Sequence, residues 1–282
     1  MILDGNLVSA TLKETYKQQV LELNKINTTV CLAVIVVGDY PASKVYVNAK
    51  IKDCQQVGIT SLKYTLSEDV TEQILIEQIH TLNKDTTVHG ILIQLPLPAH
   101  INPKKIMGEI AIHKDVDCFN PFNVGRLMID DPILKPCTPA GIITLLDFYH
   151  IPIAEKNCVI IGRSEIVGKP LSLLLLARDA TVTIAHSKTQ NLKEVTRHAD
   201  LLISAVGKPN FVTLDMVKKD CVVIDVGMNR TNTGKLCGDV DFESVSKTTS
   251  YITPVPGGVG PMTRAMLLKN TIYCAKKSHT TP

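Results

Sequence analysis

A lysine in the stretch SKVYVNAKIKDC, residues 43–54, has a spacing suited to acid/base chemistry. Tyr46 precedes Lys50 by four residues, so a helix would place both side chains on one face. A phenol ring can stack on a flat substrate, and an amine whose neutral form is favoured by burial can accept and return a proton. Taken alone, Lys50 could equally be a solvated helix lysine, the commoner case.

Gln94 and Asp117 are two further polar residues that could serve such a lysine or its substrate. Gln94 comes at the end of the apolar run ILIQL and could hold the amine by a hydrogen bond without adding charge, whereas a glutamate would form an ion pair. Asp117, in KDVD, could accept a pair of N–H donors. A turn-forming aspartate is the alternative for Asp117 alone.

A glycine-bounded turn follows the apolar run CVII and leads into a helix. Its ends are Gly162 and Gly168, and Arg163, Ser164 and Val167 lie between them. Glycine permits close approach of the backbone, and free N–H groups at a helix N-terminus attract phosphate. The spacing is not the usual G-x-G-x-x-G, so an ordinary strand-to-helix turn remains the alternative to a dinucleotide site.

The end of the next strand indicates which dinucleotide would bind. NAD enzymes commonly place an acidic residue there to bind the ribose 2'-hydroxyl, but this chain has His186, Ser187 and Lys188. Together with Arg163, these side chains could donate to a 2'-phosphate, which a carboxylate would repel. The pattern favours NADP over NAD, with a solvated loop as the alternative.

Later strands end in residues that could also contact the dinucleotide. These are Gly207 in SAVGKP and Asp225 and Gly227 in DVGMN, and ligands of open parallel sheets lie at such strand ends. The glycines could instead satisfy turns, and Asp225 could be a structural hydrogen-bond acceptor.

The elements that must position these residues alternate between strand and helix. In the first half the apolar pattern predicts strands at 31–39, 61–67 and 89–98, with helices at 42–57 and 71–84, and hence a parallel sheet. The segment 113–139 is rich in Pro, Asn and Asp, and we expect a long functional loop there. Thr138 could cap the helix that follows.

Alternation resumes in the second half of the chain. We expect strands at 157–163, 181–187, 200–207 and 221–229, with helices at 167–179 and 191–199. The predicted fold is therefore α/β with two domains, residues 1–139 and 140–262. A C-terminal helix within 263–282 is expected to pack back on the first domain.

Composition excludes several classes of protein. The chain has 282 residues, of which 45% are hydrophobic and 20% charged, and its formal net charge of +3 is not gathered in a basic run. Without a basic run, nucleic acid is not an expected partner. A membrane is not expected either, because no apolar stretch approaches the length of a membrane span. The N-terminus matches neither a signal nor a transit peptide. Eight scattered cysteines without a C-x-x-C pair indicate a reducing, cytoplasmic location and no metal site.

Seven segments in order resemble one known family. They are YVNAKIKDCQQVGI, GILIQLPLP, KDVDCFNPFNVGRL, PCTPAGIITLL, GRSEIVGKP, HSKT and TPVPGGVGPMTRAML, and they span nearly the whole chain. The chain resembles the methylenetetrahydrofolate dehydrogenase/methenyltetrahydrofolate cyclohydrolase proteins. The resemblance implies an N-terminal folate-binding catalytic domain, a Rossmann-like NADP-binding domain, an active-site cleft between them, and a homodimer.

The resemblance also implies two reactions on tetrahydrofolate derivatives and a set of residues. NADP+ would take a hydride from 5,10-methylenetetrahydrofolate, and water would open the methenyl product to 10-formyltetrahydrofolate. Tyr46, Lys50, Gln94 and Asp117 match the catalytic residues, with Asp117 suited to the pterin's N–H donors. Arg163, Ser164 and Ser187 match the cofactor side. Further substrate contacts are expected from Leu95, Pro256, Gly257 and Gly258.

Two residues depart from the family's pattern, and three rival functions remain. Cys118 replaces a usual Gly, and Asn120 stands where many members have His or Ser; a positive φ at Cys118 would strain the loop and lower folate affinity. The rivals are a monofunctional member with weak cyclohydrolase activity, a nonenzymatic dinucleotide-sensing protein, and an amino-acid or hydroxy-acid dehydrogenase. The last would want a substrate-side arginine, and the first half has only Arg126.

Overall fold

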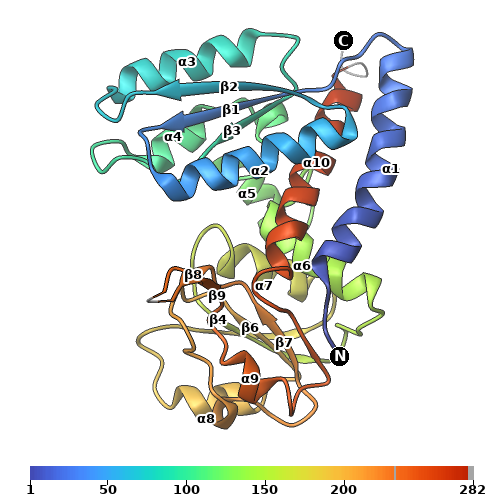
Figure 1. The fold of residues 1–282 in the computed structure, drawn as a ribbon, viewed down its shortest axis with the longest axis vertical. Coiled ribbons are helices and arrows are strands. Elements are labelled where there is room, and N and C mark those ends of the chain that lie inside the picture. The colour runs from blue at the N-terminus through green and yellow to red at the C-terminus, as the bar shows by residue number, and fades with distance from the viewer. Residues whose placement is uncertain (232, 279–282) are drawn as a thin grey trace. The chain divides into compact units, whose positions relative to one another are not determined.

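The structure is a computed structural model that describes residues 1–231 and 233–278, and the chain forms two compact units (Figure 1). The three-stranded unit comprises Thr11–Cys137 and the chain from Arg264 onward, and the five-stranded unit comprises Met1–Ala10 and Thr138–Thr263. Each unit is discontinuous in sequence. Residues 279–282 of the predicted C-terminal helix lie outside the described residues.

The first ten residues group with the five-stranded unit, although we expected them in a domain of residues 1–139. The reason is backbone pairing, since Leu3 N–H donates to Ile252 O at 2.8 Å and the Met1 amino group donates to Ser250 O at 2.6 Å. Ile2 and Ile252 also form a parallel bridge. The N-terminal segment therefore adds to the edge of the larger sheet.

The three-stranded unit has a parallel sheet in the order β2-β1-β3, as the strand–helix alternation predicted. Its strands are β1 (Cys31–Val37), β2 (Thr60–Leu66) and β3 (Gly90–Ile93), the last shorter than the predicted 89–98. Every residue of β1 is buried, as expected of a central parallel strand. Helices α3 (Glu72–Lys84) and α4 (Pro103–Glu109) pack their apolar residues on the face that carries Ala33 and Ile35.

The five-stranded unit has a parallel sheet in the order β10-β7-β6-β4-β5. Its strands are β4 (Asn157–Ile161), β5 (Thr181–Ala185), β6 (Leu201–Ser204), β7 (Val222–Asp225) and β10 (Tyr251–Ile252), with helices α7 (Gly168–Leu176), α8 (Leu192–Arg197) and α9 (Phe242–Val245). A small antiparallel pair, β8 (Asn229–Arg230) and β9 (Leu236–Cys237), lies outside this sheet. Strand order reverses at β4, whose neighbours are β5 and β6, and open α/β sheets bind ligands at such a switch point.

Several helices were missed or misplaced from the sequence. Helix α1 (Gly5–Lys25) was not predicted, although Asp4 Oδ1 accepts from the N–H groups of Asn6 and Leu7 as a helix cap. The predicted loop 113–139 overlaps the 3-10 turn Ile112–Lys114 and contains helix α5 (Pro121–Met128). Helix α6 (Cys137–Phe148) begins before Thr138, so Thr138 is not its cap, and α10 (Val259–Lys277) begins earlier than predicted.

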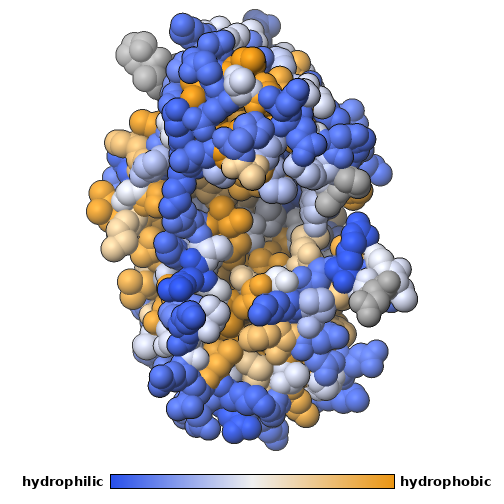
Figure 2. All heavy atoms as spheres, turned by 90° about the vertical axis from the view of Figure 1, so that its left-hand side faces the viewer, coloured by the Kyte–Doolittle hydropathy of each residue, from blue (hydrophilic) through white to orange (hydrophobic). Residues whose placement is uncertain are grey.

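On the surface, hydrophilic residues surround smaller groups of hydrophobic ones on the face drawn in Figure 2. Among the described residues, no helix combines the length and hydrophobicity of a membrane-spanning segment.

Candidate active site and dinucleotide site

Tyr46 and Lys50 lie on one helix, α2 (Pro41–Val57), which connects β1 to β2. The helix begins after Tyr40 with proline at its first position and ends at Gly58, whose φ of 84° gives a left-handed cap. Tyr46 and Lys50 are both partly buried. Their spacing of four residues therefore puts them on one helix face, as predicted.

Lys50 Nζ donates to Gln94 Oε1 at 3.0 Å. Gln94 follows β3, and its backbone N–H donates to Ile35 O of β1 at 2.9 Å, which fixes where its side chain starts. Its amide nitrogen donates to Leu95 O at 2.7 Å, so its oxygen is the atom left to face the amine. Gln94 thus holds Lys50 with a neutral acceptor, as the sequence suggested.

Asp117 is near enough to Lys50 for their charges to interact. Burial raises the pKa of the Asp117 carboxyl, while the charge of Lys50 and a hydrogen bond with the Cys137 thiol lower it. Lys50, Gln94 and Asp117 therefore form one group in the three-stranded unit. An amine between a neutral amide and a carboxylate is an arrangement that can move a proton at a bound substrate.

The loop around Asp117 is held by Asp115, a side chain that sequence reasoning did not single out for this task. Asp115 is buried and accepts from the N–H groups of Phe119 and Asn120 and from Asn123 Nδ2, at 2.8 to 3.1 Å. Burial raises the pKa of Asp115 in spite of these bonds. The one feature of the sequence that could have indicated Asp115 is its place in KDVD, two residues before Asp117.

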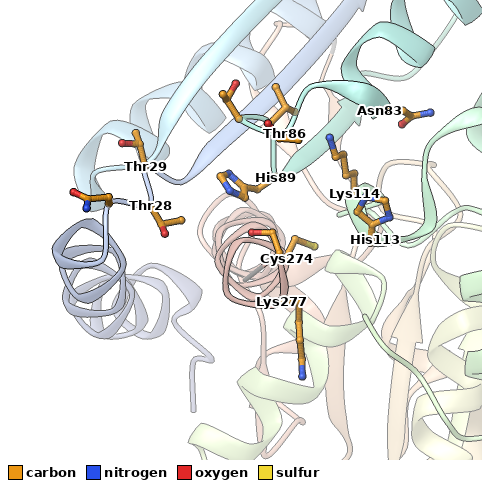
Figure 3. Close-up of a pocket in the computed structure, with 13 residues that line it drawn as sticks. Thr28, Thr29, Asn83, Thr86, His89, His113, Lys114, Cys274 and Lys277 are labelled. Atoms are coloured by element: carbon orange, nitrogen blue, oxygen red, sulfur yellow. The ribbon is translucent and has the colours of Figure 1, made fainter. Parts of the chain in front are cut away.

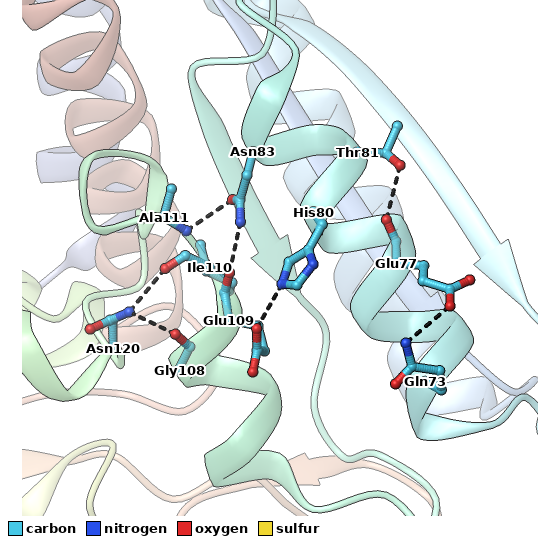
Figure 4. Close-up of polar contacts among 10 residues, drawn as sticks. All are labelled: Gln73, Glu77, His80, Thr81, Asn83, Gly108, Glu109, Ile110, Ala111 and Asn120. Carbon is cyan, nitrogen blue, oxygen red and sulfur yellow. Dashed lines mark hydrogen bonds and ion pairs between the residues drawn. The ribbon is translucent and has the colours of Figure 1, made fainter.

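Two asparagines fix the segment 108–111, which precedes this loop (Figure 4). Asn120 Nδ2 donates to Gly108 O at 3.2 Å and Ile110 O at 2.9 Å, and Asn83 bonds to Glu109 O at 2.7 Å and Ala111 N at 2.9 Å. Asn120 Oδ1 also accepts from Phe122 N–H and caps α5. Asn120 therefore has a structural task.

Cys118 has a φ of 62°, the left-handed conformation that its place in the family pattern led us to consider. Such a conformation costs a residue other than glycine about 1 to 3 kcal/mol. The side chain is fully buried, and its thiol donates to Leu134 O at 3.2 Å. Packing and this bond therefore offset part of the strain.

Pro256, Gly257 and Gly258 belong to the five-stranded unit, whereas the Lys50 group belongs to the other. Gly257 O accepts from Asn6 N–H at 3.2 Å, and a Cβ on Gly5 would lie 1.8 Å from Gly258 O. The loop is thus packed closely against the start of α1.

The glycine-bounded turn lies at the carboxyl end of β4, beside the switch point. Gly162 has a φ of 127°, and a Cβ there would lie 2.4 Å from Ala205 O, so only glycine fits. Ser164 Oγ accepts from the N–H groups of Val167 and Gly168 at 3.2 and 3.4 Å, which shapes the turn into α7. Arg163 and Ser164 are exposed.

His186, Ser187 and Lys188 lie at the neighbouring strand end, because Ile161 of β4 pairs with Ala185 of β5. A turn fixes them: Thr189 N–H donates to His186 O at 2.8 Å and Lys188 N–H to His186 Nδ1 at 3.2 Å. Ser187 and Lys188 are exposed, and in the described chain neither Arg163 nor Lys188 has a carboxylate within ion-pair distance. Two cations and a hydroxyl at this edge suit a 2'-phosphate.

Asp225 takes the structural alternative that the sequence left open. Its carboxylate accepts from the backbone N–H groups of Gly227, Asp239 and Val240 at 2.8 to 2.9 Å, and burial raises its pKa to about 6. Asp239, which sequence reasoning missed, is fully buried and accepts from Ser204, Asn229 and the N–H groups of residues 206–208. It therefore holds the loop that contains Gly207.

A cavity of about 740 Å³ lies elsewhere in the three-stranded unit (Figure 3). Its lining includes Thr28 and Thr29, which precede β1, and His89, which precedes β3, so it lies at the amino ends of strands whose carboxyl ends lead to Gln94. Lys114 there donates to Leu82 O and Asp85 O and caps the end of α3. The cavity is thus not part of the Lys50 group. In the described part of the chain, no group of His, Cys, Asp or Glu could hold a metal ion.

The sheet switch point with its glycine turn defines an α/β enzyme of the dinucleotide-dependent class. Two family models match the chain: "Tetrahydrofolate dehydrogenase/cyclohydrolase, catalytic domain" over residues 3–117, and the "NAD(P)-binding domain" of the same family over residues 136–279. The chain belongs to the tetrahydrofolate dehydrogenase/cyclohydrolase family.

Curated relatives and solved structures agree with this assignment. "Bifunctional protein FolD" of Acetivibrio thermocellus is 54% identical over 98% of this chain and 96% of its own. The crystal structure of the bifunctional FolD enzyme from Campylobacter jejuni has a TM-score of 0.96 at 52% identity, covering 98% of this chain and 99% of its own. The Trypanosoma brucei FolD structure, complexed with NADP cofactor and inhibitor, has a TM-score of 0.95 at 35% identity, covering 100% and 99%. The fold class and the resemblance predicted from the sequence are confirmed.

Proposed function

We propose that this chain is a bifunctional enzyme of folate-linked one-carbon metabolism. It oxidises 5,10-methylenetetrahydrofolate to the 5,10-methenyl cation with NADP+ and hydrolyses that cation to 10-formyltetrahydrofolate. The observation that carries the proposal is the 3.0 Å hydrogen bond from Lys50 to Gln94 beside Asp117, in a chain similar over its whole length to bifunctional FolD proteins.

The dinucleotide site fits NADP. Gly162 lets the backbone approach a pyrophosphate, and Arg163, Ser187 and Lys188 are exposed donors at the edge where the 2'-phosphate would lie. When bound, NADP+ supplies the hydride acceptor. The chain's own residues need only orient the substrate, because nitrogen lone pairs on both sides of the reacting carbon delocalise its developing charge.

The hydrolytic step needs a proton acceptor, and Lys50 is the candidate. Water that attacks the methenyl carbon must lose a proton, and a ring nitrogen must gain one as its C–N bond breaks. Gln94 orients the Lys50 amine without a negative charge that would hold it protonated. Tyr46, on the same face of α2, would stack on the folate, with Leu95 alongside, and Asp117 would accept from the pterin's N–H donors. Pro256, Gly257 and Gly258 are proposed to complete the folate site.

An absorbance time course tests both activities at once. Purified protein receives 5,10-methylenetetrahydrofolate and NADP+, and NADPH and the methenyl product are followed together. We expect NADPH to form while the methenyl product stays low relative to it. A methenyl signal that rises in step with NADPH would show a monofunctional dehydrogenase, and binding of NADP+ without NADPH formation would support a nonenzymatic dinucleotide-sensing protein.

We also propose a cytoplasmic homodimer. All eight cysteines are free thiols, seven of them buried, which suits a reducing compartment. Light scattering coupled to size-exclusion chromatography would measure the mass, and a mass of one chain would contradict the dimer.

A further inference from the structure

Asn270 lies in the part of α10 that belongs to the three-stranded unit. It bonds to both ends of the segment 116–135, which begins at the residue before Asp117. It is nearly buried, with 7% of its surface exposed. Its Nδ2 donates to Val116 O at 2.8 Å and to Lys135 O at 3.0 Å. An amide nitrogen has two protons, so each carbonyl can take one of them. One side chain thus ties residue 116 to residue 135.

Cys137 adds a second bond to the backbone beside Asp117. Its sulfur lies 3.7 Å from Asn270 Nδ2, and its thiol donates to Val116 O at 3.3 Å. Burial raises the pKa of Cys137 well above the usual range, and the charge of Asp117 raises it further, so the thiol keeps the proton that it donates. Val116 O therefore accepts from both Asn270 and Cys137.

We infer that Asn270 is a positioning residue for folate binding: together with Cys137 it holds the backbone carbonyl of Val116, and so fixes where the Asp117 side chain starts. The inference rests on the proposed role of Asp117 in binding the pterin. A carboxylate that accepts two N–H bonds must be placed precisely, and loop residues hold such a position only if their backbone is held. Asn270 supplies that restraint from a helix, which is more rigid than the loop.

The test uses the full chain with Asn270→Ala, Cys137→Ala and Asp117→Ala. Thr271→Val is the matched control, because it removes another buried hydrogen bond of α10, from Thr271 Oγ1 to Leu267 O at 2.8 Å, without a bond to the 116–137 segment. KM for 5,10-methylenetetrahydrofolate and KM for NADP+ are measured separately from NADPH formation. A merely structural defect would not raise one KM and leave the other unchanged.

We expect Asn270→Ala and Cys137→Ala each to raise KM for the folate by about tenfold, the size of one lost hydrogen bond, with KM for NADP+ unchanged. The double variant Asn270→Ala/Asp117→Ala should be no worse than Asp117→Ala alone, because both changes act on one contact. If Asn270→Ala does not fold, Cys137→Ala carries the test.

Two results would overturn the inference alone: a normal folate KM in the Asn270 and Cys137 variants while Asp117→Ala raises it, or an equal rise in Thr271→Val. A normal folate KM in Asp117→Ala would instead overturn the proposed role of Asp117, and the inference with it.

Discussion

The amine of Lys50 has one hydrogen-bond acceptor of neutral charge, Gln94, and one nearby carboxylate, Asp117. These neighbours have opposite effects on proton transfer. The amide directs the amine without a charge, whereas the carboxylate stabilises the ammonium form once the proton has been taken up. This arrangement places the amine to accept a proton from water and return it to a ring nitrogen.

Replacement of Lys50 by methionine separates the two activities. Lys50→Met keeps the length of the side chain but removes the proton acceptor, so we expect hydrolysis of the methenyl product to fall by at least about 100-fold. NADPH formation should persist, because hydride transfer needs no protein base. Lys52→Met, an exposed position on the same helix, is the control. Hydrolysis at the normal rate in Lys50→Met would exclude Lys50 as the base.

Cys118 tests whether loop strain reaches the folate site. Cys118→Gly removes the strain of a φ of 62°, but it also removes a buried thiol bonded to Leu134 O. We expect tighter folate binding with little change in the free energy of unfolding, because the two stability effects oppose each other within about 1 to 2 kcal/mol. Folate affinity measured by titration calorimetry should rise; unchanged affinity would show that the strain does not matter for binding.

Individual site residues could be predicted where spacing or strand ends restrict them. Lys50 and Gln94 were expected together because the resemblance to the family implies both in the folate site. The spacing of Lys50 from Tyr46 and the place of Gln94 after an apolar strand agree with that role. Asp115 and Asp239 were not predicted, because their partners are backbone N–H groups that only the folded chain brings together. Almost every residue has a backbone N–H group, so a buried carboxylate that binds such groups leaves no recognisable motif in the sequence.

At the scale of elements, the ends of β6 and β7 depend on two buried carboxylates. Both oxygens of Asp239 accept hydrogen bonds, Oδ2 from Val206 N–H and Oδ1 from Lys208 N–H and Asn229 Nδ2. In Asp239→Asn, the new NH₂ group would therefore face a donor whichever way the amide is turned. We expect a loss of about 3 kcal/mol in the free energy of unfolding and weaker NADP+ binding, because the loop with Gly207 loses its anchor. Urea denaturation and NADP+ titration would measure both. The exposed Asp220→Asn is the control, and equal effects there would contradict the assignment.

Asp225, at the end of β7, should titrate far above an ordinary aspartate. Its pKa is about 6 in the folded chain against 3.8 for the unperturbed group, so between these values only the folded chain keeps the proton. The free energy of unfolding from this group is therefore fully present below about 3.8 and falls by about 3 kcal/mol as the pH rises to about 6. Carboxyl ¹³C NMR, assigned with Asp225→Asn, measures the titration. A midpoint near 4 would mean that the three N–H bonds outweigh burial.

Elements with strong apolar alternation were predictable, and those held by tertiary contacts were not. The central strands β1, β4, β6 and β7 follow runs of Val, Ile and Leu, whereas the two-residue edge strand β10 was not predicted. Helix α1 buries Val8, Tyr16, Val20 and Leu23 at widely spaced positions, and its cap, Asp4, lies among residues with no other helix signal. Helix α5 depends on Asn120 and Pro121, which look like loop residues until their capping role is seen.

At the scale of the whole molecule, three helices have residues in both units. They are α1, α6 and α10, since the unit boundaries fall after Ala10, Cys137 and Thr263. Helix formation is cooperative, so melting one end of such a helix weakens the other. The expected return of the C-terminal helix to the first unit is confirmed from Arg264 onward. The grouping of Met1–Ala10 with the other unit was not predicted, because it depends on backbone pairing with Ile252, for which the hydrophobic pattern carries no signal.

These shared helices lead to a prediction about ligand stabilisation. NADP+ at about 100 times its Kd should stabilise the folded chain by about 2.7 kcal/mol, and we expect it to raise the temperature of a single unfolding transition for the whole chain. Two transitions in calorimetry, with only one raised by NADP+, would contradict that coupling.

Arg163→Ala/Lys188→Ala should reduce the NADP+ effect to that of NAD+, because the two side chains act on the 2'-phosphate alone. Lys247→Ala, exposed in the same unit, should leave the difference between the two dinucleotides intact. If the double variant still distinguishes NADP+ from NAD+, selectivity comes from other residues at the end of β5.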